Sequence, residues 1–524
     1  MTILANEPFG KTKTVTFMKM IKSVGIITLI AIVSKILGFG RDLLMAAYFG
    51  ASTVTDAFFV ASIIPVLLFA AVGMAITSGI VPIYAEAKEK SRQEARDVIS
   101  ILATLFITLS IILTFLFYLA TPFMTKLIAP GFNTQQAGLT NQLTMIMLPS
   151  FCFFVLSAIM TGILEYEKVF APPAFIAIPQ NLFVIITIIF LTKQYGIYGV
   201  AVATLLGAIS QFFILYPFIK KYQVFYVNFA FKTYQKQIFD TLRLFSPIFI
   251  ASGAYQINAV VDRMVASRLP EGSVSALNYA NKLMYLPLSI LLLSLITVIF
   301  PSVVDAAVKR GGEFVQWVFK GISLITFAAI PIAVVMLIES SILVELAFKR
   351  GAFDDSAASM TKQAFFFYTF GMVFMALKEY LNRCFVALKE TKVTMTCSIL
   401  SVALNIVLSI ILAHFFGVGG IALATAIAML FQTLLLFFSL SKHVPIEKTA
   451  KLSFKKSLGK LLILFGLVFL VSRLSAFIIP VTNPILHLGL VTLITFALFT
   501  AAALLLKSQE ILGLMQIIKR RKQT

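Results

Sequence analysis

The chain has 524 residues, of which 60% are hydrophobic and only 12% charged, and its mean hydropathy is +0.97. A soluble protein carries about 25% charged residues, so this composition excludes a water-soluble protein of this length. The apolar residues occur in runs of about twenty, enough for a helix to cross about 30 Å of hydrocarbon. The alternating segments of about ten residues that form outer-membrane barrels are not seen. The composition predicts an all-α polytopic membrane protein.

The hydropathy pattern predicts about fourteen membrane-spanning helices. A basic segment, Lys11 to Lys22, precedes the first apolar run and imitates a secretory signal. Because so many spans follow it, we interpret it as part of an uncleaved first helix. The predicted spans are 22–40, 56–84, 97–120, 140–163, 172–192, 197–219, 244–265, 274–302, 315–338, 360–385, 394–414, 418–440, 458–479 and 485–506.

Basic residues outnumber acidic ones, with 43 Lys and Arg against 22 Asp and Glu and a formal net charge of +21. They lie in short breaks between apolar runs, which favours contact with anionic membrane lipids over nucleic-acid binding. Breaks rich in basic residues alternate with breaks that contain few, so the positive-inside rule predicts that both termini are cytoplasmic. The largest basic breaks are Lys88–Arg96, Lys220–Arg243, Lys442–Lys456 and Lys519–Lys522.

An internal repeat divides the chain. Tyr195–Gln211 matches Phe416–Gln432 at a constant shift, and Val81–Ala87 is echoed by Phe300–Ala306. The shift spans six helices, an even number, so the copies form a parallel repeat, which points to a substrate site between the halves. The alternative is chance recurrence of small-residue helix patterns. We predict an N-terminal lobe of six helices (1–221), a C-terminal lobe of six (222–441), and two further helices with a basic tail (442–524).

Ionisable residues inside the predicted spans are the informative ones, because each costs about 2.5–3.5 kcal/mol at the bilayer centre on insertion scales. Lys35 lies about halfway along the first span and Lys282 about two turns into the eighth, so they come from opposite repeats at comparable depth. Two cations that face one cavity suit an anionic head such as a diphosphate. The alternative is that each lysine snorkels to the interface or pairs with a local carboxylate, as Arg41 could with Asp42.

A second polar group consists of Asn258, Asp262, Asn405 and Thr425, in the seventh, eleventh and twelfth predicted spans. Oxygen ligands of this type could hold Na⁺, or Asp262 alone could carry a proton. An ion pair of Asp262 with a neighbouring arginine, Arg263 or Arg268, explains this carboxylate equally well. The spacing does not decide between these interpretations.

Other residues favour structural roles. Asp56 follows Thr55 at the start of the second span, as a helix N-cap residue would. Asp354 and Asp355 resemble the acidic pair of lipid-dependent glycosyltransferases, but a solvated loop is the favoured interpretation because no large outer domain surrounds them. Gly10-Lys11-Thr12 lacks the first glycine of a phosphate-binding loop, so we expect no direct use of ATP and no cofactor other than Na⁺. No disulfide or metal spacing connects Cys152, Cys384 and Cys397 or His414, His443 and His487.

Several motifs together resemble the MurJ/MviN family of lipid II flippases, in the superfamily that also contains multidrug and polysaccharide exporters. They occur in order over nearly the whole chain, at Ser34–Asp42, Tyr48–Gly50, Thr55–Val60, Gly272–Met284, Phe300–Pro301 and Arg350–Phe353. The resemblance implies a two-lobed, fourteen-helix carrier in the bacterial cytoplasmic membrane, not an enzyme. It would move an undecaprenyl-diphosphate-linked peptidoglycan precursor outward by alternating access, with the cell-wall synthesis machinery as a possible partner.

The resemblance also implies site residues. Lys35 and Arg41 stand where family members have basic residues in the first helix, Lys282 where they have an arginine in the eighth, and Asp56 where they have an acidic residue opening the second. These four are the implied substrate-binding residues. The segment Pro65–Ala70 lacks the arginine pair that members with a charged second helix carry, so one cation of the expected substrate cage is missing.

For the coupling ion, Asp262, Asn405 and Thr425 match positions that ligate sodium in some family members. Ser409 stands where those members have a further carboxylate, which puts the sodium site in doubt. Three alternative functions stay open: a flippase for another lipid-linked oligosaccharide, a cation-coupled drug exporter, and a membrane glycosyltransferase or polymerase that uses Asp354 and Asp355.

Overall fold

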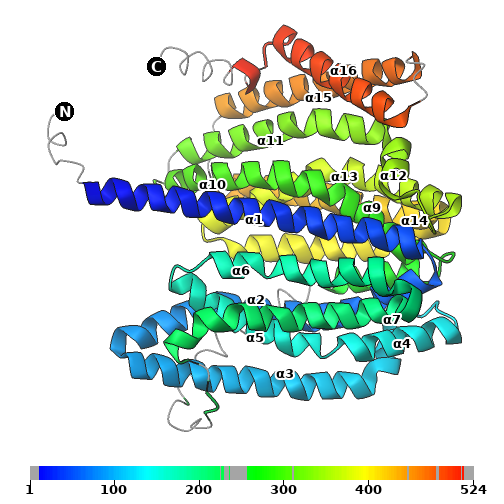
Figure 1. Cartoon of the computed structure of the whole chain (residues 1–524). Coiled ribbons are helices and arrows are strands. Elements are labelled where there is room, and N and C mark those ends of the chain that lie inside the picture. The colour runs from blue at the N-terminus through cyan, green and yellow to red at the C-terminus, as the bar shows by residue number, and fades with distance from the viewer. Residues whose placement is uncertain are drawn as a thin grey trace, which may run out of the picture. The chain divides into compact units, whose positions relative to one another are not determined.

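The structure is a computed structural model that describes residues 11–224, 226–228, 235, 256–309, 312–444, 448–478, 483–508 and 510–512. Every regular element in these ranges is a helix (Figure 1). The long elements are α1 (Lys11–Phe49), α2 (Thr53–Lys90), α3 (Arg92–Ile128), α4 (Thr134–Met147), α5 (Ser150–Tyr166), α7 (Ala177–Ile219), α9 (Ser273–Pro287), α10 (Leu293–Val308), α11 (Gly312–Ile338), α13 (Asp355–Ala387), α14 (Thr391–His443), α15 (Lys448–Ile478) and α16 (Pro484–Leu505). The short ones are α6 (Ala171–Phe175), η1 (Lys220–Tyr222), η2 (Leu288–Leu292) and α12 (Ser340–Phe348).

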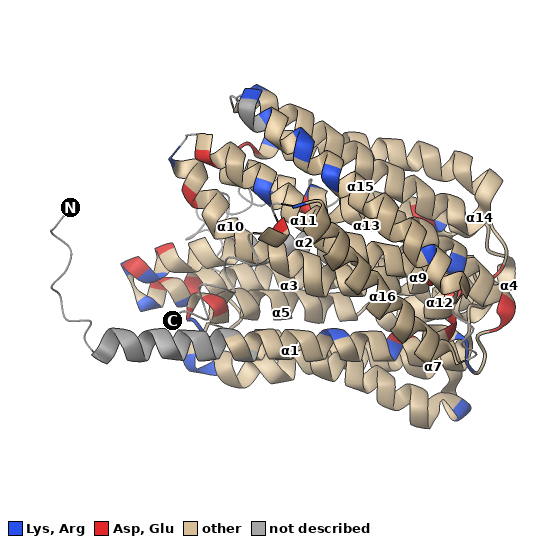
Figure 2. Ribbon diagram, turned by 90° about the horizontal axis from the view of Figure 1, so that it is seen from above, with Lys and Arg blue, Asp and Glu red and all other residues tan. Residues whose placement is uncertain are grey.

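The described residues contain 10 helical stretches that are long and apolar enough to cross a membrane. Charged residues lie mostly toward the ends of the helices, and long middle segments contain few of them (Figure 2). Both observations confirm the all-α polytopic fold. The count of fourteen spans stays a prediction, because the span 244–265 is described only from residue 256 onward. The basic tail at 519–522 lies outside the described residues.

The two longest apolar stretches each contain a glycine break that divides them into two helices. In α7, Gly196 has φ 54° and ψ −141°, and in α14, Gly417 has φ 53° and ψ −131°. This backbone conformation is open to glycine and strained for other residues. The breaks fall between the predicted spans 172–192 and 197–219 and between 394–414 and 418–440. The same local geometry thus recurs at equivalent positions of the internal repeat.

The chain forms two compact units. Unit 1 comprises residues 1–44, 61–124 and 140–253, and unit 2 comprises residues 45–60, 125–139 and 254–524. The core of unit 1 is an apolar cluster of α2, α3, α5 and the end of α7, which includes the fully buried Ile99, Phe151 and Ile163. The predicted lobe boundaries at 221 and 441 stay predictions.

In unit 2, the helices α15 and α16 pack on α11. Phe319 of α11 stacks on Phe454 of α15 with ring centroids 4.4 Å apart, and Phe327 packs on Phe499 of α16 at 4.7 Å. A polar contact also connects this region to α16, with Nε2 of His487 3.5 Å from Oε1 of the buried Glu339. The two helices predicted as an appendage are therefore held to unit 2 by both apolar and polar contacts.

Candidate substrate and ion sites

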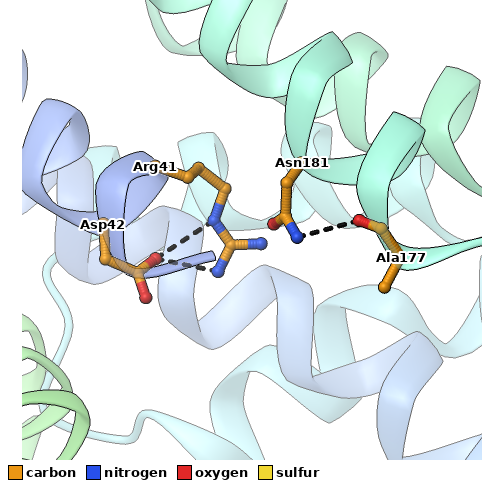
Figure 3. A network of polar contacts seen from close by, with 4 residues as sticks. All are labelled: Arg41, Asp42, Ala177 and Asn181. Atoms are coloured by element: carbon orange, nitrogen blue, oxygen red, sulfur yellow. Dashed lines mark hydrogen bonds and ion pairs between the residues drawn. The ribbon is translucent and has the colours of Figure 1, made fainter. Parts of the chain in front are cut away.

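In unit 1, α1 carries the predicted basic residues Lys35 and Arg41. Lys35 is exposed. Arg41 donates from Nε and Nη2 to Oδ1 of Asp42 at 3.1 and 2.8 Å, so the adjacent pair foreseen from the sequence does form. The Arg41 guanidinium faces the Asn181 amide of α7 (Figure 3). That amide is oriented by donating from Nδ2 to the Ala177 carbonyl at 2.9 Å.

In unit 2, the predicted Lys282 lies on α9 and is exposed. Lys35 and Arg41 belong to the other unit, so a cavity shared by Lys35 and Lys282 stays a prediction.

Asp56 caps a helix other than its own. It is 3% exposed; its Oδ2 accepts from the Gly272 backbone N–H at 2.8 Å, and its Oδ1 accepts from the Ser275 N–H and hydroxyl at 2.7 and 2.5 Å. These donors open α9, where the first N–H groups have no intrahelical acceptor and a carboxylate is favourable. At the start of α2, it is the Thr55 side chain that accepts a backbone hydrogen bond, from the Ser52 N–H to Oγ1 at 2.8 Å. The expectation of a cap on the second span is corrected, because the capped helix is α9.

The loops around this cap interlock closely enough to require glycine. A Cβ at Gly351 would lie 2.1 Å from the Ala47 carbonyl oxygen, and one at Gly50 would lie 2.4 Å from that of Ala352. The Ala352 N–H donates to the same Ala47 carbonyl at 2.8 Å. Both glycines have positive φ, 61° at Gly351 and 67° at Gly50. Residues 45–60 therefore pack tightly within unit 2, although most of α1 and α2 belongs to unit 1.

A polar cavity of about 290 Å³ lies inside unit 2, between the helix over residues 256–266, α9, α13 and α14. It brings together the predicted ion residues Asp262, Asn405 and Thr425. Oδ1 of Asp262 accepts from the Ser409 hydroxyl at 3.3 Å, and Oδ2 accepts from Nδ2 of Asn258 at 3.4 Å. Nδ2 of Asn405 donates to Oγ1 of Thr425 at 3.3 Å.

These residues fit a small hard cation. Carboxylate, amide and hydroxyl oxygens are the ligands that such ions prefer. The Asp262 carboxylate receives only two long hydrogen bonds, and the Asn258 Oδ1 atom is buried without a donor among the described residues. When bound, a cation would neutralise the Asp262 charge. Ser409 supplies a hydroxyl where a second carboxylate was expected, so this chain offers one negative charge.

The cavity also contains a basic residue that the sequence interpretation missed. Lys378, in the middle of α13, is 7% exposed and pairs with Glu379 at 2.9 Å. It lies within the predicted span 360–385, so the rule that flagged Lys35 and Lys282 would have found it.

Comparison with known proteins decides the family. Residues 45–501 match the family described as lipid II flippase MurJ. The chain belongs to the MurJ family. It is 30% identical over 433 residues to a probable lipid II flippase MurJ of Buchnera aphidicola, which covers 80% of this chain and 83% of that protein. It is 25% identical over 515 residues to one of Treponema pallidum, with 94% and 96% covered.

Solved structures agree with this assignment. A lipid II flippase MurJ in an inward closed conformation matches with a TM-score of 0.76 and 28% identity, over 91% of this chain and 99% of that one. An inward-facing multidrug resistance MATE transporter of the MOP superfamily shares the fold, with a TM-score of 0.64 and 15% identity, over 80% of this chain and 97% of that one. The chain is therefore a multi-pass membrane transporter rather than an enzyme.

The acidic pair that suggested a glycosyltransferase has structural roles in this MurJ family member. Oδ1 of Asp354 accepts from the Ala357 N–H at 2.8 Å and caps α13. Asp355 pairs with Lys349 at 2.6 Å in an exposed position.

We predict that Asp56→Ala destabilises the protein by about 1–3 kcal/mol, because it leaves the buried donors at the start of α9 without an acceptor. Asp56→Asn should cost less, since an amide oxygen can still accept one of these bonds. Thermal unfolding of the purified full chain measures both. Asp355→Asn is the matched control, because its exposed ion pair contributes little. Equal melting temperatures for Asp56→Ala and Asp355→Asn would contradict the capping role.

Proposed function

We propose that this chain flips lipid II, the undecaprenyl-diphosphate-linked peptidoglycan precursor, across the bacterial cytoplasmic membrane by alternating access. The observation that carries the proposal is the match to the lipid II flippase family over residues 45–501. The 28% identical MurJ structure, which is covered to 99%, supports it independently. The cell-wall synthesis enzymes that use the exported precursor are the expected partners.

The substrate head carries a diphosphate, and moving it through a low-dielectric cavity requires fixed positive charge in place of water. Lys35, Arg41 and Lys282 are the residues that we assign to this task. Arg41 directs Nε and Nη2 to Asp42, which leaves its other N–H donors for a phosphate oxygen. A guanidinium fork is well matched to that ligand.

Release of the substrate on one side requires a closed segment to open. We assign this step to the packed loops around Asp56, where residues 45–60 join α9 and the loop before α13. Their polar contacts include the Asp56 cap, the backbone bond from Ala352 to Ala47 and the bond from the Tyr279 hydroxyl to the Gly50 carbonyl. An alternating-access cycle would break and remake them together, which is typical of a two-state element.

Both termini lie in the cytoplasm in this proposal, because the basic breaks then fall inside. We predict that a cysteine at the exposed Gln135 reacts with an impermeant thiol reagent added to intact cells, and that one at the exposed Glu390 reacts only after permeabilisation. The three native cysteines are first replaced by serine. The reverse labelling pattern would overturn the orientation.

We further propose that the membrane potential drives export, with Na⁺ at Asp262, Asn405 and Thr425 as coupling ion. One charge crossing 100 mV changes the free energy by about 2.3 kcal/mol, and a negative interior pushes an anionic head outward. Neither energy source requires ATP.

We predict that Na⁺, but not choline, raises the melting temperature of the purified protein by mass action. Asp262→Asn should abolish this shift because it removes the carboxylate of the set. Asp305→Asn, at an exposed carboxylate of α10, should keep it. A sodium response that survives Asp262→Asn would place the cation elsewhere.

We predict that Lys35→Ala and Lys282→Ala each lower lipid II affinity about tenfold to a hundredfold, since each removes a charge-assisted contact of roughly 1.5–3 kcal/mol. Arginine at either position should be tolerated better, because its planar fork also binds phosphate. The assay is complementation of flippase-depleted cells, with membrane levels checked by blot. Lys193→Ala, at an exposed lysine of α7, is the control. Full growth with both alanine variants at normal expression would show that the head binds elsewhere.

A second candidate function is export of a different lipid-linked oligosaccharide. The segment Pro65–Ala70 favours it, because the chain has no arginine where family members of the charged type carry a pair. Depletion of the protein separates the two functions by the lipid-linked intermediate that accumulates on the cytoplasmic face.

A further inference from the structure

Two of the adjacent Arg and Asp pairs in this chain, Arg41–Asp42 and Asp262–Arg263, behave differently. Arg41 folds back onto Asp42, with Nη2 2.8 Å from Oδ1 (Figure 3). Asp262 and Arg263 are also neighbours, yet they make no ion pair with each other in the described structure. Nη1 of Arg263 donates instead to the Ala259 carbonyl at 2.9 Å, one turn back on its own helix. The Arg263 Nε is buried and has no acceptor among the described residues.

This donor belongs to the wall of the unit 2 cavity. Asn278 and Asn281 of α9 and Tyr368 of α13 line the same cavity, and each can donate a hydrogen bond. The charged residues of the wall are Asp262, Arg263 and Lys378, a formal excess of one positive charge. Arg263 lies on the helix over residues 256–266 and Lys378 on α13, so the two cations come from different helices of the wall.

We propose that the cavity binds a small oxyanion, a phosphate or carboxylate group, at Arg263. A buried guanidinium N–H that makes no hydrogen bond is costly, so a ligand that accepts from it should bind well. The fork of guanidinium donors matches two oxygens of a planar carboxylate or a tetrahedral phosphate. The neighbouring amides and the phenol hydroxyl supply further donors. Lysine could not reproduce this arrangement, because its ammonium is a point donor on a flexible stem.

The site is continuous with the predicted substrate contact. Asn281 lines the cavity, and the next residue of α9 is the exposed Lys282. The oxyanion is therefore either a group of the lipid-linked head, which rests on the proposed function, or a free inorganic anion.

The Asp262 carboxylate, next to Arg263 in the sequence, links the oxyanion site to the proposed cation site. A cation at Asp262 removes a negative charge next to Arg263, so cation and oxyanion should each strengthen binding of the other by the same factor.

The first experiment uses the purified full chain in nanodiscs of zwitterionic lipid, with inorganic phosphate as the N-methylglucamine salt. We expect phosphate to raise the melting temperature above that of N-methylglucamine chloride at equal ionic strength. Arg263→Gln should weaken the apparent phosphate affinity by about tenfold to a hundredfold. Arg268→Gln, at an exposed arginine five residues along the chain, should respond as the wild type does.

A second variant guards against misfolding of Arg263→Gln. Asn281→Asp keeps the side-chain size and retains Arg263, but it places a negative charge in the wall and should abolish the phosphate response. The proposal is overturned if the wild type shows no phosphate response above chloride. It is equally overturned if both Arg263→Gln and Asn281→Asp keep that response at wild-type affinity.

Two further arms identify the source of the oxyanion and its linkage to the cation. If undecaprenyl diphosphate competes with phosphate in the wild type and binds Arg263→Gln more weakly, the site receives the substrate head. If it does not compete while phosphate still binds, the ligand is a free anion. Added Na⁺ should strengthen phosphate binding by about fivefold or more in the wild type and not in Asp262→Asn. If the wild-type protein does not transport lipid II but keeps its phosphate response, the proposed function is refuted and the oxyanion site still stands.

Discussion

Hydrocarbon offers no hydrogen-bond partner, so each polar group that enters the membrane must find a partner within the protein. The helices satisfy the backbone in this way, and the ionisable side chains follow the same constraint. Arg41 pairs with Asp42, Lys378 with Glu379, and Glu339 with His487. Asp56 binds the N-terminus of α9. Among the described residues, Asn258 and Arg263 each keep a buried polar atom without a partner, and both line the unit 2 cavity.

Hydropathy and repeat analysis predicted the helical framework well, because the bilayer imposes length and composition on each span. The breaks at Gly196 and Gly417 fall between predicted spans, even though the helices continue on either side without a loop. The sequence signal for these breaks is a glycine at equivalent positions of the two repeats, since only glycine adopts that backbone conformation without strain. The helices extend beyond the predicted membrane spans. For example, α3 covers Arg92–Ile128 around the predicted span 97–120, because helices continue into the polar interface where hydropathy falls.

The site was predicted less completely, because its partners lie far apart in the sequence. Asp56 was recognised as a capping residue, but Gly272 and Ser275 are more than two hundred residues away, and local pattern cannot name them. The candidate ion residues Asp262, Asn405 and Thr425 were singled out as polar residues inside predicted spans and then by family resemblance, and the structure gathers them in one cavity. Adjacency in sequence was a poor guide to pairing: it predicted Arg41 with Asp42 correctly but did not describe Asp262 with Arg263. The difference lies in which way the helix surface directs each side chain, which tertiary packing decides.

The serine at position 409 and the orphan donor of Arg263 are connected by charge balance. In a cavity with two carboxylates and one arginine, a bound monovalent cation would bring the total charge of these groups to zero. This chain has Asp262 alone, so the same cation leaves one positive charge on Arg263 in a poorly solvating environment. An unpaired charge there is costly unless it acquires a partner. An oxyanion would supply that partner, and it would bind more strongly once a cation has neutralised Asp262. With one carboxylate in place of two, the proposed cation site would also make cation and anion binding depend on each other.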